Sequence, residues 1–158
     1  MQRRLSALRR RVCGFTLIEL LVVIAVVAVL TVIAVPSFTQ MIAANRVRGS
    51  AQDLYSALLK ARAEALKRNT TITLRRVGTW SAGWEIVDEA PDPDLVLERG
   101  GPARRVTLTE ANGLNSVQYL SSGRATAALD MRIEDAGGKT ADRCVRIDLS
   151  GMPKAGEC

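Results

Sequence analysis

The sequence contains no histidine, and this absence excludes two large classes of site. Without an imidazole anywhere in the 158 residues, neither a Ser-His-Asp type triad nor a His-ligated metal site can form. Only three cysteines are present, Cys13, Cys144 and Cys158, and three thiols at this spacing without histidine make a poor zinc site. No nucleophile constellation is recognisable either. We therefore expect no catalytic residues, no metal, no cofactor and no enzymatic activity.

Acidic residues are missing from the N-terminal tail, whereas basic residues are concentrated there. The formal net charge of the chain is +6, but 17 basic and 16 acidic residues remain from Phe15 onward. The tail itself contributes Arg3, Arg4, Arg9, Arg10 and Arg11. This distribution predicts the orientation of a membrane segment, with the tail in the cytoplasm, rather than a nucleic-acid-binding domain.

A long apolar run follows the tail. Between Phe15 and Val35 the only charged residue is Glu19, and as a helix this run would span about 31 Å, enough to cross a bilayer. A secretory signal peptide has the same basic start, but its apolar part is usually about 7–15 residues long and ends at an A-x-A site. A plain membrane anchor would not explain Glu19, because a carboxylate inside a membrane is costly and usually has a partner.

The string GFTLIELLVVIAVVAVLTVIAVPSF, residues 14–38, resembles the prepilin signature of type IV pilins and type II secretion pseudopilins. The resemblance implies that a prepilin peptidase cleaves between Gly14 and Phe15 and that the new amino group of Phe15 is methylated. It also implies that Glu19 pairs with the N-terminal amine of a neighbouring subunit and so guides assembly. Pro36 should kink or loosen the helix, because it lacks a backbone donor.

The rest of the chain predicts an α+β fold of the type IV pilin kind, with a long N-terminal helix packed on an antiparallel β-sheet domain. A 4-3-4-3-4 apolar spacing continues the helix to about Arg68, and Tyr55, Leu59 and Leu66 widen its apolar stripe. Alternation of period two beyond Asn69 predicts seven strands. We expect a leader at 1–14, a transmembrane or filament-core helix at 15–35, an amphipathic helix at 36–68 and a sheet domain at 69–158. The apolar stripe consists of Val47, Ala51, Leu54, Leu58, Ala61 and Ala65.

The C-terminal segment resembles the GspH/FimT group of minor pilins and pseudopilins. The resemblance lies in the turn Ser122-Gly123-Arg124, the strand CVRIDLSG and a short tail that ends in cysteine. An extracytoplasmic location favours a disulfide between Cys144 and Cys158, closing a loop of about 15 residues. Cys13 would leave with the leader.

Some DNA-uptake pilins of this group carry a basic GRxR-type tail. Here the corresponding residues are Gly151-Met152-Pro153-Lys154, so a methionine replaces the first arginine. Arg124 and Lys154 are the candidate DNA contacts, but phosphate binding scales with the number of cations engaged.

These resemblances imply a minor type IV pilin that primes or caps pilus assembly in twitching motility. It would be a single-pass protein of the bacterial inner membrane with its globular domain in the periplasm, and would later enter the pilus or pseudopilus. Its expected partners are the prepilin peptidase, other minor and major pilins or pseudopilins, and inner-membrane lipid. The alternatives are a minor pseudopilin of type II secretion, acting in protein export, and a DNA-binding minor pilin of natural transformation.

Overall fold

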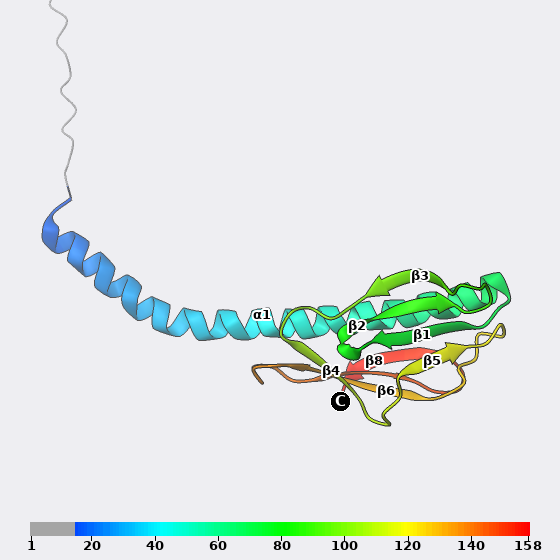
Figure 1. Cartoon of the computed structure of the whole chain (residues 1–158). Helices are drawn as coiled ribbons and strands as arrows, with labels where there is room; N and C mark the ends of the chain where they lie inside the picture. Colours follow the sequence, from blue (N-terminus) through cyan, green and yellow to red (C-terminus); the bar gives the residue numbers. More distant parts are fainter. Residues whose placement is uncertain (1–14) are drawn as a thin grey trace, which may run out of the picture. The chain divides into compact units, whose positions relative to one another are not determined.

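The computed structural model describes residues 15–158, so the predicted leader, Gly14 and Cys13 lie outside the described part. This part of the chain contains one α-helix followed by eight β-strands (Figure 1). The helix α1 spans Leu17–Arg68. The strands are β1 Ile72–Val77, β2 Thr79–Asp88, β3 Leu95–Gly100, β4 Val106–Glu110, β5 Ser116–Tyr119, β6 Leu129–Asp135, β7 Arg143–Ile147 and β8 Pro153–Glu157.

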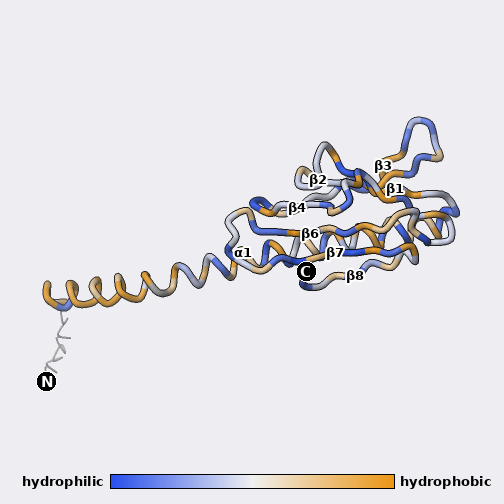
Figure 2. Tube along the Cα trace, turned by 90° about the horizontal axis from the view of Figure 1, so that it is seen from below, coloured by the Kyte–Doolittle hydropathy of each residue, from blue (hydrophilic) through white to orange (hydrophobic). Residues whose placement is uncertain are grey.

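The chain divides into two compact units, Met1–Ser37 and Phe38–Cys158, and α1 contributes to both of them. The first unit includes the apolar half of α1, which Figure 2 shows as an almost unbroken hydrophobic stretch. The second unit includes the amphipathic half of α1 and all eight strands. We call this second unit, residues 38–158, the globular domain.

The strands of the globular domain form two four-stranded antiparallel sheets. The first has the order β3-β2-β1-β5 and the second the order β4-β6-β7-β8. The first residues of β2 reach the second sheet, where the Ser81 hydroxyl donates to the Leu108 carbonyl at 3.2 Å and accepts from the Leu108 amide at 2.9 Å. This pair of hydrogen bonds joins β2 to β4.

The predicted apolar stripe of α1 is confirmed, since all six of its residues are buried. Of the three residues predicted to widen the stripe, Tyr55 and Leu59 are half-buried, whereas Leu66 is half exposed. The helix ends at Arg68, and Asn69 follows with a φ of 54°. Asparagine tolerates this left-handed conformation and commonly ends helices in this way.

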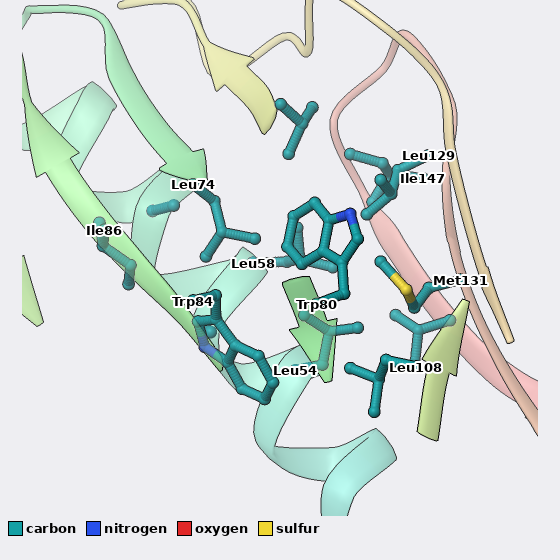
Figure 3. Close-up of a cluster of buried hydrophobic side chains, with 14 of the residues drawn as sticks. Leu54, Leu58, Leu74, Trp80, Trp84, Ile86, Leu108, Leu129, Met131 and Ile147 are labelled. Carbon is teal, nitrogen blue, oxygen red and sulfur yellow. The ribbon is translucent and has the colours of Figure 1, made fainter. Parts of the chain in front are cut away.

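One hydrophobic core joins the helix to both sheets. Figure 3 shows Trp80 among Leu54 and Leu58 of α1, Leu74 of the first sheet and Met131 of the second. Trp80 and Trp84 are both buried, at 5% and 2% exposure, and the Trp80 indole donates to the Leu114 carbonyl at 2.8 Å. Because the core draws on α1 and on both sheets, the amphipathic half of α1 is an integral part of the globular domain.

The sheet region contains one strand more than the seven that the sequence predicts. The predicted antiparallel region is arranged as two sheets, and the additional strand, β8, pairs with β7. β8 reads PKAGE, begins with proline, includes a glycine and exposes every residue after Pro153. Such a strand has no apolar alternation to reveal it, and proline is tolerated because β8 lies at a sheet edge.

Candidate assembly site

The N-terminal end of α1 is held by a side-chain cap. Thr16 precedes the first helical residue, and its hydroxyl accepts a hydrogen bond from the Glu19 amide at 3.3 Å. The Thr16 carbonyl also accepts the first helical bond, from the Leu20 amide at 3.1 Å. Thr16 and Glu19 therefore form one half of a capping box, a T-x-x-E pattern that the sequence displays but that the sequence analysis did not use.

Glu19 lies in the first turn of the helix, and its side chain is exposed. Within residues 15–158 no cation pairs with its carboxylate and no backbone amide donates to it. The positive end of the helix dipole favours an anion at this position. The carboxylate is thus placed at the helix start with its acceptor oxygens available to a donor from another molecule.

The apolar side chains around Glu19 have no cover in the isolated chain. Phe15 is 72% exposed and Leu17 is 77% exposed, and the large apolar side chains described along the helix as far as Phe38 are exposed as well. By length and composition, α1 includes a stretch able to cross a membrane. Nonpolar surface of this extent is stable only in lipid or against the helices of other subunits.

Two residues within this stretch bear on the helix backbone. The Thr31 hydroxyl donates to the Val27 carbonyl at 2.7 Å, so its polar group is satisfied within the helix. Pro36 lies inside α1. A proline there removes one helical donor, and the predicted kinking role of Pro36 stays a prediction.

Phe15 is the first described residue, and Gly14 lies outside the described part. Phe15 and Thr16 are not helical. The bond predicted for cleavage therefore precedes the first helical turn, and no helical hydrogen bond of α1 protects the residue on its C-terminal side.

The C-terminal end of the chain is fixed by a disulfide and by strand pairing. Cys144 and Cys158 form the bridge, with a Cα–Cα distance of 5.0 Å. β7 and β8 pair with Cys144 opposite Gly156 and Arg146 opposite Lys154. The bridge and the ladder together secure the edge strand β8.

The two candidate DNA contacts, Arg124 and Lys154, are both exposed, on different elements. Lys154 lies 3.6 Å from Asp148, and its neighbours on β7 are paired too. Arg146 contacts Asp130 at 3.0 Å, and Arg143 contacts Glu157 at 3.5 Å. These carboxylates reduce the positive charge that the tail could offer to phosphates, and the hypothesis of DNA contact stays a hypothesis.

Hydrogen bonds also shift the pKa values of several carboxyls. A hydrogen bond from Arg75 at 2.8 Å, helped by one from Arg99, lowers the pKa of Glu85 against the opposing effect of its burial. Hydrogen bonds from the Ser150 hydroxyl and amide lower the pKa of Asp148. The described residues contain no group of three or more His, Cys, Asp or Glu side chains that could hold a metal ion.

Comparison with known proteins places these features in a family. Residues 9–35 match the prokaryotic N-terminal methylation motif, and residues 50–151 match the family described as type II transport protein GspH. No relative was found among curated protein sequences.

Two solved proteins have a similar fold. One is the minor type IV pilin FimU of Pseudomonas aeruginosa, with a TM-score of 0.60 and 17% identity over 71% of this chain and 89% of that one. The other is the minor pseudopilin EpsH of the type 2 secretion system of Vibrio cholerae, with a TM-score of 0.61 and 17% identity over 71% of this chain and 97% of that one. The predicted fold of one long helix packed on antiparallel sheet is therefore confirmed. The chain belongs to the GspH family of minor type IV pilins and pseudopilins.

Proposed function

We propose that this protein is a minor type IV pilin that primes or caps the assembly of a pilus. The observation that carries the proposal is the start of α1, where one exposed carboxylate stands at the head of an uncovered apolar helix. A helix of this kind serves as a membrane anchor before assembly and as part of a helical filament core afterwards. No enzymatic step is assigned to the chain itself.

Maturation would come first. A prepilin peptidase cleaves between Gly14 and Phe15, which leaves 144 residues, and methylates the amino group of Phe15. The cut removes the five arginines of the tail and creates a new amine at the start of the helix. Before the cut, those arginines hold the tail on the cytoplasmic side, and the globular domain lies in the periplasm, where its disulfide is stable.

Glu19 would then select the docking position. When the helix enters the filament core, its carboxylate leaves the polar surroundings and needs a cation. The methylated amine of a neighbouring Phe15 supplies one. Removing one partner from a buried ion pair costs about 3–5 kcal/mol, so a subunit that docks out of register is strongly disfavoured.

A second candidate is a minor pseudopilin of a type II secretion system. It is favoured by the similarity to EpsH, whose TM-score equals that of FimU within 0.01. The steps of maturation and docking would be the same in both machines, and only the exported or displayed product would differ.

A clean deletion strain tests the proposal and separates the two candidates. It is scored in parallel for surface pili, for twitching motility and for secreted exoproteins, with a plasmid-borne copy of the gene as the control. We expect loss of pili and twitching with normal secretion. Loss of secretion with normal pili would move the protein to the secretion machine and refute the pilus function.

A further inference from the structure

A small basic pocket lies at the start of the globular domain. It has a volume of about 160 Å³ and is enclosed by the beginning of the amphipathic half of α1, the loop before β4 and the β6–β7 turn. Its lining consists of Thr39, Ile42, Ala43, Arg46, Arg105, Asp135 and Lys139. We call it the basic pocket.

Three cations of the basic pocket lack acidic partners. Arg46, Arg105 and Lys139 are exposed, and within residues 15–158 none of them has a carboxylate oxygen within 4 Å. A Cβ atom built on Gly137 would lie 3.0 Å from Asp135 Oδ2, 3.6 Å from Arg105 Nη2 and 3.7 Å from Lys139 Cε. The Arg105 and Lys139 side chains thus converge, from two different loops, on one place beside the Asp135 carboxylate.

The one carboxylate of the pocket, Asp135, is committed to the turn beside it. It is 7% exposed, and its Oδ2 accepts hydrogen bonds from the Gly137 amide at 3.0 Å and from the Lys139 amide at 3.2 Å. The lining therefore carries a surplus of two positive charges. Asp135 ends β6 of the second sheet, and the Arg132 side chain on the same strand is paired with Asp142 at 2.7 Å.

The first residue of the basic pocket, Thr39, lies close in sequence to the end of the apolar run at Val35. Thr39 follows Val35 by four residues, which rise about 6 Å in a helix and span at most about 14 Å when fully extended. Each headgroup layer of a bilayer is about 5–8 Å thick beyond the hydrocarbon core. If residues 15–35 cross the core, Thr39, at the near edge of the pocket, lies at the depth of the lipid headgroups.

We propose that the basic pocket binds the phosphate of an anionic phospholipid headgroup while the subunit resides in the membrane. Two guanidinium groups and one ammonium group supply forked and single donors suited to phosphate oxygens. The half-buried Ile42 offers an apolar edge beside them. The inference depends on the membrane helix, but it holds for a pilin and for a pseudopilin alike.

Native mass spectrometry of the full chain in an uncharged detergent tests this site. The protein is titrated with phosphatidylglycerol and, separately, with phosphatidylcholine of the same acyl chains. Each juxtamembrane cation strengthens binding to anionic lipid by roughly fivefold, so the three together contribute on the order of 100-fold. We expect one tightly bound phosphatidylglycerol, and we expect the R46Q/R105Q/K139Q variant to lose it.

The matched control is R76Q/R124Q/K154Q, which removes two arginines and one lysine elsewhere on the domain. It should keep the bound lipid, because it leaves the basic pocket intact. The N-terminal arginines are the same in every variant, so they do not contribute to a difference between variants. Equal binding of the two lipids, or equal loss in both triple variants, would overturn the proposal. A third titration with glycerol phosphate separates a lipid from a soluble phosphate ester, and equally tight binding of that soluble ester would also overturn it. Circular dichroism verifies that each variant is folded. The lipid titrations and the deletion phenotype are separate measurements, so failure of the lipid proposal is distinguishable from failure of the proposed function.

Discussion

Replacing Gly151 with alanine should lower the free energy of unfolding of the globular domain by about 2–5 kcal/mol. Gly151 has a φ of +77°, and an alanine in this left-handed conformation costs about 1–2 kcal/mol. Its Cβ would also lie 2.3 Å from the Gly123 carbonyl oxygen and 3.1 Å from the Ala125 amide nitrogen. Both are backbone atoms that cannot rotate away, so overpacking adds about 1–3 kcal/mol.

Two other glycines separate these contributions. Gly113 has a similar φ of +74°, but a Cβ there would meet no atom within 4 Å, so Gly113→Ala should cost only the conformational 1–2 kcal/mol. Gly156 has neither a positive φ nor a neighbour within 4 Å. Gly156→Ala should therefore be neutral or slightly stabilising, by roughly 0.5–1 kcal/mol within a strand.

Urea unfolding of residues 38–158 measures all three variants, because this unit contains the whole hydrophobic core. Fluorescence reports the transition through the buried Trp80 and Trp84. The predicted order of stability is Gly156→Ala, then Gly113→Ala, then Gly151→Ala. If Gly151→Ala is as stable as Gly113→Ala, the close approach of the 122–124 and 148–151 turns is absent in solution and the reasoning is wrong.

Three further outcomes are expected. The Cys144–Cys158 bridge joins residues 14 apart, and its reduction should lower the free energy of unfolding by about 3 kcal/mol. Calorimetry should show a lower Tm with reductant than without it, and the double alanine variant should have the same lowered Tm. Arg75 lowers the pKa of Glu85 below its unfolded value, so the stability from this pair is present above the unfolded pKa and is lost as the pH falls through the folded pKa. The urea midpoint of unfolding should therefore fall between pH 7 and pH 3, and it should fall less steeply in the Glu85→Gln variant. Glu19→Ala should leave the chain in the membrane but reduce the amount of it found in sheared pili by on the order of 100-fold, as expected for a loss of about 3 kcal/mol. Immunoblots of sheared pili that show unchanged incorporation would contradict the docking mechanism.

Periodicity predicted the helix because burial follows it closely. Ala51, Leu58 and Ala65 recur on one face of α1, and all three are buried. Leu66 belongs to the same apolar pattern, yet it is half exposed beside the 122–124 turn. Its exposure depends on which loops reach that side of the helix, and the spacing of apolar residues does not encode this.

The two sheets and the basic pocket depend on long-range pairing. Ser81 gives no sign in the sequence that it bonds β4, and Gly151 looks like Gly113 until the approach of Gly123 is seen. Arg46, Arg105 and Lys139 are far apart in sequence and meet only when the β6–β7 turn packs near the start of the globular domain. Interactions between close neighbours in sequence do leave a recognisable pattern, as the T-x-x-E spacing of Thr16 and Glu19 does, although the predictions above did not include this cap.

The position of Glu19 in the first turn of α1 bears on why a single carboxylate can direct assembly. The helix dipole stabilises an anion in the first turn by about 0.3–1 kcal/mol at an exposed site, whereas leaving one charge of a buried pair without its partner costs about 3–5 kcal/mol. The helix dipole is therefore too weak to satisfy the Glu19 carboxylate once it leaves water, and a deficit of roughly 2–4 kcal/mol remains. On the proposed mechanism, only the amine of a neighbouring subunit removes this deficit, so docking in register is favoured by about 30- to 1000-fold over docking without that contact. Glu19→Asp keeps the charge but shortens the side chain, so it should retain part of this preference where Glu19→Ala retains none.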